Sequence, residues 1–157
     1  EPIATQVDRF MVAQAIMLAL AGMPGIYFHS LFGSRNDCAA ALATGVNRRI
    51  NRQKFTRAEL EAELGNPQSL RAQVFGRFRE LLITRRAHPA FAPDARQEVL
   101  ELDARVFAVL RESRDGADRM LCVHNVSDQP VELPAPPRTA GMTRLSPFEV
   151  NWQVTNR

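Results

Sequence analysis

The feature that most constrains this chain is an apolar segment near its start that is broken in the middle. Residues 6–21 are mostly helix-forming Ala, Met, Leu and Gln, and apolar side chains would cover nearly every face of the helix. Gly22 and Pro24 end it. The next residues, 25–30, form a short, bulky apolar run, which is typical of a strand buried on both faces of a parallel sheet. Gln14 and the Gly-Pro break interrupt the stretch before it reaches the roughly 20 apolar residues of a membrane span, so we expect no membrane segment.

A buried helix followed by a single buried strand does not make a domain. Helix, turn, strand and polar loop are one link of an architecture that alternates strands and helices, and one strand cannot form a sheet. We therefore expect this chain to be a piece of a longer protein. We also expect residues 1–30 to expose an apolar surface that rearranges or packs against a second copy as a homodimer.

A polar loop and two helices are predicted next. Residues 31–55 lack hydrophobic periodicity and are rich in Gly, Ser, Asn, Asp and Arg, which predicts a loop. Loops of this length are usually functional or disordered. Thr56 and Glu59 form a capping box that begins a short helix ending near Gly65. A longer amphipathic helix is expected over 69–86 and ends before His88-Pro89. Its apolar stripe consists of Leu70, Val74, Phe78, Leu81 and Leu82.

After Asp94 the hydrophobic period changes from 3.6 to 2, which predicts a small antiparallel β domain. Asp115-Gly116 is a hairpin signal between two of its strands. We place the domain boundary near residues 89–96, giving domains of 1–92 and 93–157. The expected strands are 99–102, 106–111, 119–126, 131–133, 142–145 and 150–154, and Pro134, Pro136 and Pro137 lie in the connection before 142.

Charge and cysteine content exclude several classes of protein. The net charge is +3, but the 17 acidic residues are spread among the 20 basic ones, and no basic stripe with interleaved aromatic residues suggests nucleic-acid binding. Cys38 and Cys122 lie far apart without metal-ligand spacing, which predicts reduced thiols in a cytoplasmic protein. No signal peptide is visible. We expect no metal site and no cofactor.

Two sequence stretches resemble the sucrose phosphorylase branch of glycoside hydrolase family 13. Residues 21–37 read AGMPGIYFHSLFGSRND and are similar to the family's eighth barrel strand and the start of its loop. Residues 44–52 read TGVNRRINR, in which an Arg followed two residues later by Ile-Asn-Arg is typical of that loop. Residues 100–107 and 121–127 resemble strands of its C-terminal β domain. The resemblance implies an α/β plus all-β chain: the last helix-strand-helix part of a (β/α)8 barrel, then a small antiparallel β domain.

The same resemblance implies a retaining α-glucosyl phosphorylase. Such enzymes hold glucose on one carboxylate and use a second as acid/base; here inorganic phosphate takes the glucosyl unit to give α-glucose 1-phosphate. The family's carboxylates follow strands four, five and seven and would lie before Glu1, and Glu1, Asp8 and Asp37 match none of their motifs. We therefore expect no catalytic residue in this chain and no activity from it alone. Sucrose, sucrose 6-phosphate and glucosylglycerate remain open as substrates.

Candidate binding residues lie in the loop after the eighth strand, because barrel active sites form at the carboxyl ends of the strands. By resemblance, Arg48 reaches the acceptor subsite or phosphate. Arg49 replaces an acidic or small residue of the family, which favours an anionic acceptor. Asp37 is expected to orient an arginine. The full set of candidate substrate- and phosphate-binding residues is His29, Arg35, Asp37, Asn47, Arg48 and Arg49.

A second hypothesis is a non-catalytic module that binds carbohydrate or a protein partner through its β domain. An assay for phosphorolysis distinguishes the two classes. His88 and His124 are expected to be structural, and Tyr27 and Phe28 to pack inside a barrel.

Overall fold

The computed structural model describes residues 1–133 and 142–155, and the chain divides into two compact units. The β unit comprises Glu1–Pro24 and Glu80–Arg157. The loop unit comprises Gly25–Arg79. The β unit thus contains the first helix of the chain as well as the strands, and the division at residue 92 remains a prediction for the complete barrel protein.

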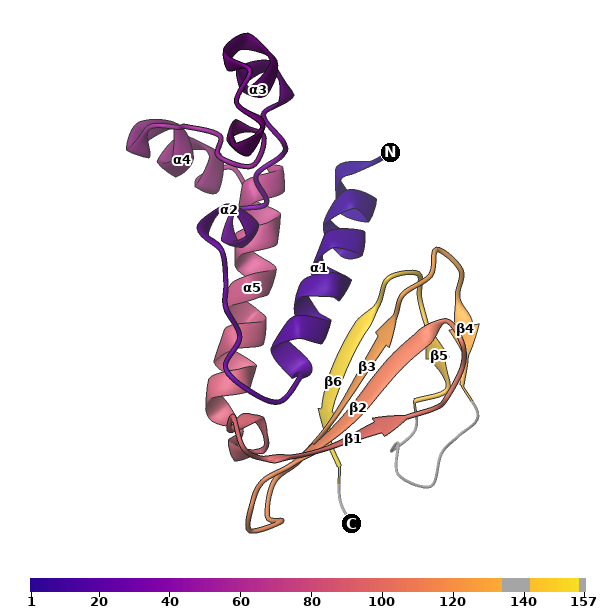
Figure 1. The fold of residues 1–157 in the computed structure, drawn as a ribbon. Coiled ribbons are helices and arrows are strands. Elements are labelled where there is room, and N and C mark those ends of the chain that lie inside the picture. Colours follow the sequence, from indigo (N-terminus) through magenta and orange to yellow (C-terminus); the bar gives the residue numbers. More distant parts are fainter. Residues whose placement is uncertain (134–141, 156–157) are drawn as a thin grey trace. The chain divides into compact units, whose positions relative to one another are not determined.

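The β unit is built on a four-stranded antiparallel sheet with the order β1-β2-β3-β6 (Figure 1). Aligned residues cross the sheet in register, with Val109 opposite Cys122 and Cys122 opposite Trp152. A separate antiparallel pair, β4–β5, completes the unit. The six strands confirm the predicted ones to within three residues at each end; the proline-rich connection falls outside the described residues. Their bounds are Arg96–Leu100 (β1), Val106–Glu112 (β2), Arg119–Asn125 (β3), Val131–Glu132 (β4), Arg144–Leu145 (β5) and Val150–Val154 (β6).

The alternating strand pattern separates two apolar layers on opposite faces of the sheet. On one face, side chains such as Leu110 and Val123 pack with Val131 and Leu145 from the β4–β5 pair. The other face is formed by the intervening residues, which pack against Ala19 of the first helix and against the turn that contains Phe91. These intervening residues are Val109, Met120 and Cys122, with Phe107 and Trp152 at the border.

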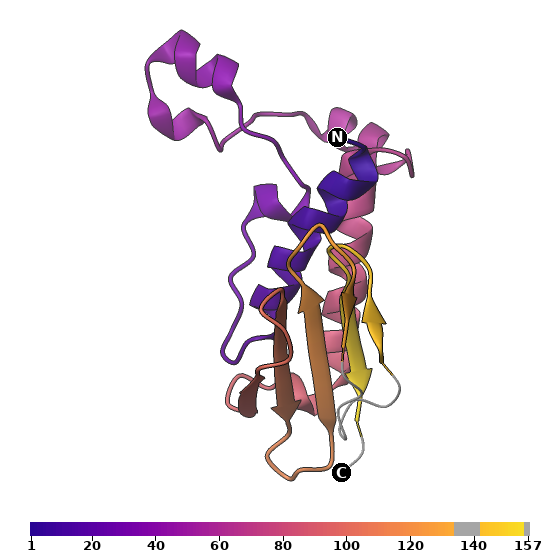
Figure 2. The ribbon, with the colours of Figure 1, turned by 90° about the vertical axis from the view of Figure 1, so that its right-hand side faces the viewer.

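Helix α1 (Ile3–Ala19) covers this second face, as Figures 1 and 2 both show. Its buried stripe runs through Val7, Met11, Ala15 and Leu18, at spacings of four, four and three residues. The helix prediction is confirmed, and the sheet of the same chain covers part of this helix. The expectation that residues 1–30 rearrange or pack against a second copy of the chain remains a prediction.

Two arginines hold the carboxyl end of α1. Arg111 on β2 is fully buried and donates to the carbonyls of Ala19 (2.8 Å) and Ala92 (3.0 Å). Arg85 donates to the carbonyls of Leu18 and Gly22. Both groups lie where the helix dipole is negative and helical carbonyls lack partners. Burial lowers the pKa of both guanidinium groups, yet arginine stays charged because its ordinary pKa is far above neutral.

His124 on β3 is buried and fully hydrogen-bonded, which confirms its structural role. Its Nδ1 lies 3.0 Å from the carbonyl of Phe107, and its Nε2 lies 3.0 Å from the indole nitrogen of Trp152. Because the indole only donates, Nε2 must accept, and Nδ1 carries the hydrogen. Burial lowers the pKa of His124 to about 4. His88 is also structural: its Nδ1 lies 3.0 Å from the carboxylate of Asp118, which also accepts from Ala90 N–H.

The predicted helices of the loop unit form, but the predicted strand over residues 25–30 does not. Phe28 begins a single helical turn, and Tyr27 and Phe28 are about half exposed instead of packed in a barrel. No strand among the loop unit's residues offers a partner for this segment. Its backbone is satisfied locally instead, by bonds such as Ser34 N–H to the His29 carbonyl (2.8 Å). The helices are α2 (Phe28–Leu31), α3 (Cys38–Thr44), η1 (Asn47–Arg49), α4 (Arg57–Leu64) and α5 (Leu70–Ala87), followed by η2 (Pro89–Phe91).

The helix boundaries follow from local chemistry. Thr56 and Glu59 form the predicted capping box of α4, and the hydrogen bonds from Thr56 lower the pKa of Glu59. Gly45 ends α3 in the left-handed conformation. Of the helices in the described residues, none combines the length and the apolar character needed to cross a membrane.

Candidate functional site

The loop unit carries all six predicted site residues, and its centre is an aromatic cluster around His29. The His29 ring makes edge contacts with Tyr27 (5.3 Å between centroids), Phe28 (5.4 Å) and Phe55 (5.8 Å). On its other side, His29 Nδ1 lies 3.0 Å from the hydroxyl oxygen of Ser34. The ring is therefore held at a defined position and is only partly buried.

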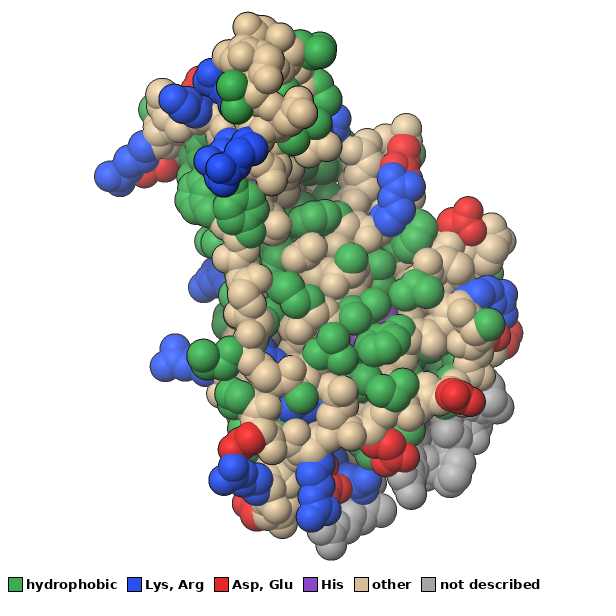
Figure 3. All heavy atoms as spheres, in the orientation of Figure 1, with side chains coloured by type: hydrophobic (Ala, Val, Ile, Leu, Met, Phe, Trp, Pro, Cys, Tyr) green, Lys and Arg blue, Asp and Glu red, His purple; other side chains and the backbone are tan. Residues whose placement is uncertain are grey.

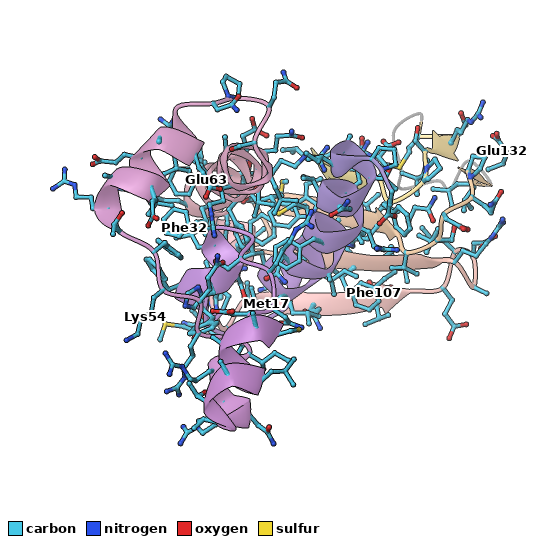
Figure 4. The ribbon with its side chains drawn as sticks, turned by 90° about the horizontal axis from the view of Figure 1, so that it is seen from above. Met17, Phe32, Lys54, Glu63, Phe107 and Glu132 are labelled. Atoms are coloured by element: carbon cyan, nitrogen blue, oxygen red, sulfur yellow. The ribbon has the colours of Figure 1, made fainter. Side chains whose placement is uncertain are left out.

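Arg71 on α5 holds the segments around this cluster together. Only 6% of it is exposed, and it donates to several groups from different parts of the loop unit. Its guanidinium also lies 4.7 Å from the centre of the Phe55 ring. In Figure 4, Glu63 on α4 and Phe32 after α2 lie next to each other, as expected for two partners of one arginine. The partners are the Phe32 carbonyl (3.2 Å), Ser34 Oγ (2.8 Å), Gln53 Oε1 (3.0 Å) and the Glu63 carboxylate (2.9 Å).

A glycine allows this close packing. Gly33 has a φ of +58°, in the left-handed region, and a Cβ added to it would lie 2.8 Å from Cγ2 of Val74 on α5. Both the backbone conformation and the approach of α5 thus require glycine here. Phe32 beside it is buried and stacks on Phe75 with centroids 5.3 Å apart.

We expect Gly33→Ala to lower the free energy of unfolding of the loop unit by about 2–4 kcal/mol, from left-handed strain and overpacking together. Gly45→Ala is the matched control, because its φ is +63° but nothing lies within 4 Å of the added Cβ; it should cost only about 1 kcal/mol. Urea unfolding measures both. Adding Val74→Ala should recover part of the loss in the first variant and none in the second, and equal costs for the two glycines would contradict the packing account.

The remaining site residues lie on a loop that folds back on itself. Asp37 caps α3 by accepting from Ala40 N–H (3.0 Å), and its own N–H donates to the Ile50 carbonyl (2.6 Å). The Tyr27 hydroxyl donates to the Asn51 carbonyl (3.2 Å). These two bonds bring the segment 44–52 back beside the segment 21–37. Asp37 serves as a helix cap here, and its expected role of orienting an arginine remains a prediction.

The cationic residues lie on the outside of this loop. Asn47, Arg48 and Arg49 form the short helix η1; Asn47 and Arg48 are exposed, Arg49 is partly exposed, and Arg35 is exposed before α3. Figure 3 shows Lys and Arg side chains standing out from the part of the surface that carries α3 and α4. Exposed guanidinium groups on a folded loop provide donors for an anionic oxygen.

The carboxylates of the loop unit are engaged in structural contacts. Asp37 and Glu59 are helix caps. Glu61 pairs with Arg57 (2.7 Å), and Glu63 pairs with Arg71 (2.9 Å). The loop unit contains no other acidic residue. It therefore offers groups that bind an anion and no pair of unengaged carboxylates of the kind that retaining glycosidases use.

Within residues 1–133 and 142–155, no three His, Cys, Asp or Glu side chains gather in a way that could hold a metal ion.

Arg71 was not identified from the sequence, although its position on the helix indicates its role. Arg71, Val74 and Phe78 follow one another at spacings of three and four on α5, and these are the residues of α5 that are buried. A charged residue in line with an apolar stripe marks a buried, bonded charge.

The chain matches known phosphorylases over most of its length. No protein-family model matches it. It is 48% identical over 123 residues to a glucosylglycerate phosphorylase of Spirochaeta thermophila, a match that covers 78% of this chain and 21% of that protein. It is 33% identical over 84 residues to a sucrose phosphorylase of Agrobacterium vitis, covering 54% of this chain and 16% of that protein. The chain spans about a fifth of the length of these relatives.

The fold also has solved counterparts. A cyclic α-maltosyl-(1→6)-maltose hydrolase from Arthrobacter globiformis superposes with a TM-score of 0.69 over 96% of this chain and 31% of that structure, at 19% sequence identity. At that identity the likeness concerns the fold alone. In that solved structure, the part that matches this chain is 31% of a longer chain.

Proposed function

Because this chain belongs to the sucrose and glucosylglycerate phosphorylase branch of glycoside hydrolase family 13, we propose that it is part of a retaining α-glucosyl phosphorylase. The parent enzyme cleaves an α-glucoside with inorganic phosphate and releases α-glucose 1-phosphate. The finer assignment of residues 1–92 to the end of a (β/α)8 barrel, and of 93–157 to its C-terminal β domain, is part of this proposal. No cofactor is needed by this chemistry.

Within that family we propose glucosylglycerate as the substrate. Its leaving group carries a carboxylate, whereas the fructose released from sucrose is neutral. The adjacent cations of η1, the exposed Arg48 and the partly exposed Arg49, support an anionic leaving group, and the higher identity to the glucosylglycerate enzyme points the same way. The observation that carries the proposal is the pair of arginines in a unit whose carboxylates are all engaged elsewhere.

The proposed role of the loop unit is to bind the substrates, and it supplies no group that forms or breaks a covalent bond. Arg48 supplies a planar pair of donors to phosphate or to the leaving carboxylate. Arg49, Arg35 and the Asn47 amide add hydrogen-bond donors at the entrance of the same active site. The nucleophile and the acid/base lie in the part of the parent enzyme outside this chain. The free cysteines, Cys38 and Cys122, support a cytoplasmic location.

The role of Arg48 is tested in a chimera, in which this chain replaces the matching segment of the 48%-identical relative. Arg48→Ala should lower kcat/KM for phosphorolysis roughly 10- to 100-fold, because a hydrogen bond to an anion contributes about 1.5–3 kcal/mol. Arg57→Ala is the control, since Arg57 is an exposed arginine of the same unit that pairs with Glu61. Equal effects of the two substitutions on kcat/KM would refute the assignment of Arg48.

A further inference from the structure

We propose that Arg71, acting through Ser34, fixes His29 in the tautomer that carries its hydrogen on Nε2, so that His29 presents a single N–H donor to an anionic oxygen. Arg71 is then a positioning residue, and His29 a specificity-determining one. The identity of the ligand rests on the proposed function, whereas the tautomer rests on the described side chains alone.

The tautomer follows from counting donors at the Ser34 hydroxyl. A guanidinium only donates, so the 2.8 Å bond from Arg71 Nη1 uses the Ser34 oxygen as an acceptor. The Ser34 O–H is left to donate, and His29 Nδ1 lies 3.0 Å away. If Nδ1 carried the hydrogen, the Ser34 O–H would have no acceptor among the described residues. With Nδ1 unprotonated, all three groups are satisfied, and the hydrogen of the neutral ring sits on Nε2.

The ring is oriented as well as protonated at one nitrogen. The same arginine that binds Ser34 lies 4.7 Å from the centre of Phe55, and the Phe55 ring meets His29 edge to face at 5.8 Å. Tyr27 and Phe28 contact the ring from the neighbouring backbone. Within the described residues His29 Nε2 has no hydrogen-bond partner, so its N–H remains available to a ligand.

The other two histidines have the opposite arrangement. His124 and His88 both place Nδ1 at 3.0 Å from an acceptor oxygen, the Phe107 carbonyl and the Asp118 carboxylate respectively. In each of these the hydrogen sits on Nδ1 when the ring is neutral. They are therefore internal references for His29, and the chain has no further histidine.

The ligand chemistry is that of an oxygen with negative charge. A neutral imidazole N–H in the same unit as the exposed guanidinium groups suits the carboxylate of an acceptor or an oxygen of inorganic phosphate. A neutral glucosyl acceptor would bind less tightly, because the N–H of His29 Nε2 would then lack a strong hydrogen-bond acceptor.

The tautomer is measured on this chain by nitrogen-15 correlation spectra of its imidazoles at alkaline pH. We expect one histidine protonated on Nε2 and two on Nδ1. Ser34→Ala should move only the His29 signals, toward the average of two exchanging tautomers, while Ser30→Ala leaves them in place. A wild-type His29 protonated on Nδ1, or signals unmoved by Ser34→Ala, would overturn the inference.

The ligand role is measured in the chimera described above. His29→Gln places an amide N–H near the position of Nε2, and His29→Asn places one near Nδ1. We expect His29→Asn to raise KM for the anionic partner roughly 10- to 100-fold and His29→Gln less than about tenfold. A change confined to KM for glycerate assigns the carboxylate, and one confined to KM for phosphate assigns phosphate. The reverse order of the two variants would overturn the role, while an inactive wild-type chimera would count against the proposed function and leave the tautomer result standing.

Discussion

Replacing Arg71 with methionine should lower the free energy of unfolding of the loop unit by about 3–5 kcal/mol, because the buried guanidinium is the shared donor of several groups and each hydrogen bond to a charged group contributes about 1.5–3 kcal/mol. Methionine keeps the length of the side chain and removes its charge. The Glu63 carboxylate, the Phe32 carbonyl and the Gln53 amide would lose their shared donor. A loss of this size approaches the whole stability of many small domains. Hydrogen exchange of residues 28–55 should then become fast.

The control for this variant is Arg57→Met on α4. Its ion pair with Glu61 has the same 2.7–2.9 Å geometry as that of Arg71 with Glu63, but 89% of the Arg57 side chain is exposed against 7% for Arg71. We expect a cost below about 1 kcal/mol, because exposed pairs contribute little. Similar urea midpoints for the two variants would mean that Arg71 does not hold the loop unit together.

Lowering the pH from about 7.5 to about 4 should cost the β unit about 3 kcal/mol through His124 alone. The pKa of His124 is lowered from 6.5 to about 4 by burial. Between these values the unfolded chain binds a proton that the folded chain does not, so stability is present above pH 6.5 and falls as the pH drops toward 4. The hydrogen bonds to Phe107 and Trp152 leave no place for a second ring hydrogen.

His124→Asn isolates this contribution from other acid-sensitive groups. Asparagine can still donate to the Phe107 carbonyl, but it does not titrate. The variant should be less stable than the wild type at neutral pH and should lose less stability on acidification, so that the two urea-unfolding curves converge near pH 4. Parallel pH dependences in the two proteins would show that another group controls the acid transition.

Local patterns in the sequence were enough to predict most of the elements. The capping box at Thr56 and Glu59 located the start of α4, and Asp115-Gly116 lies in the turn that joins β2 to β3. Short runs of alternating or continuously apolar residues located all six strands, and β2 and β3 bury side chains on both faces of the four-stranded sheet. These signals lie within a few residues of the structure that they predict.

Interactions between distant residues could not be predicted in the same way. The run 25–30 has the composition of a buried strand, but a strand forms only where a neighbour accepts its hydrogen bonds, and the loop unit provides none. Arg111 looks like an ordinary strand residue until α1 places its carbonyls beside it. For the candidate site, the sequence indicated which loop carries the cations, whereas the Arg71–Ser34–His29 connection joins residues up to 42 apart and emerges only from the fold.

We propose that this chain contributes binding groups to an α-glucosyl phosphorylase whose reacting carboxylates lie outside it. The proposal is tested by the release of α-glucose 1-phosphate from glucosylglycerate and inorganic phosphate, measured for this chain alone and for the chimera with the 48%-identical relative. We predict no product from the chain alone and the α-anomer from the chimera. Product from the chain alone, or a folded chimera that releases none, would contradict the account.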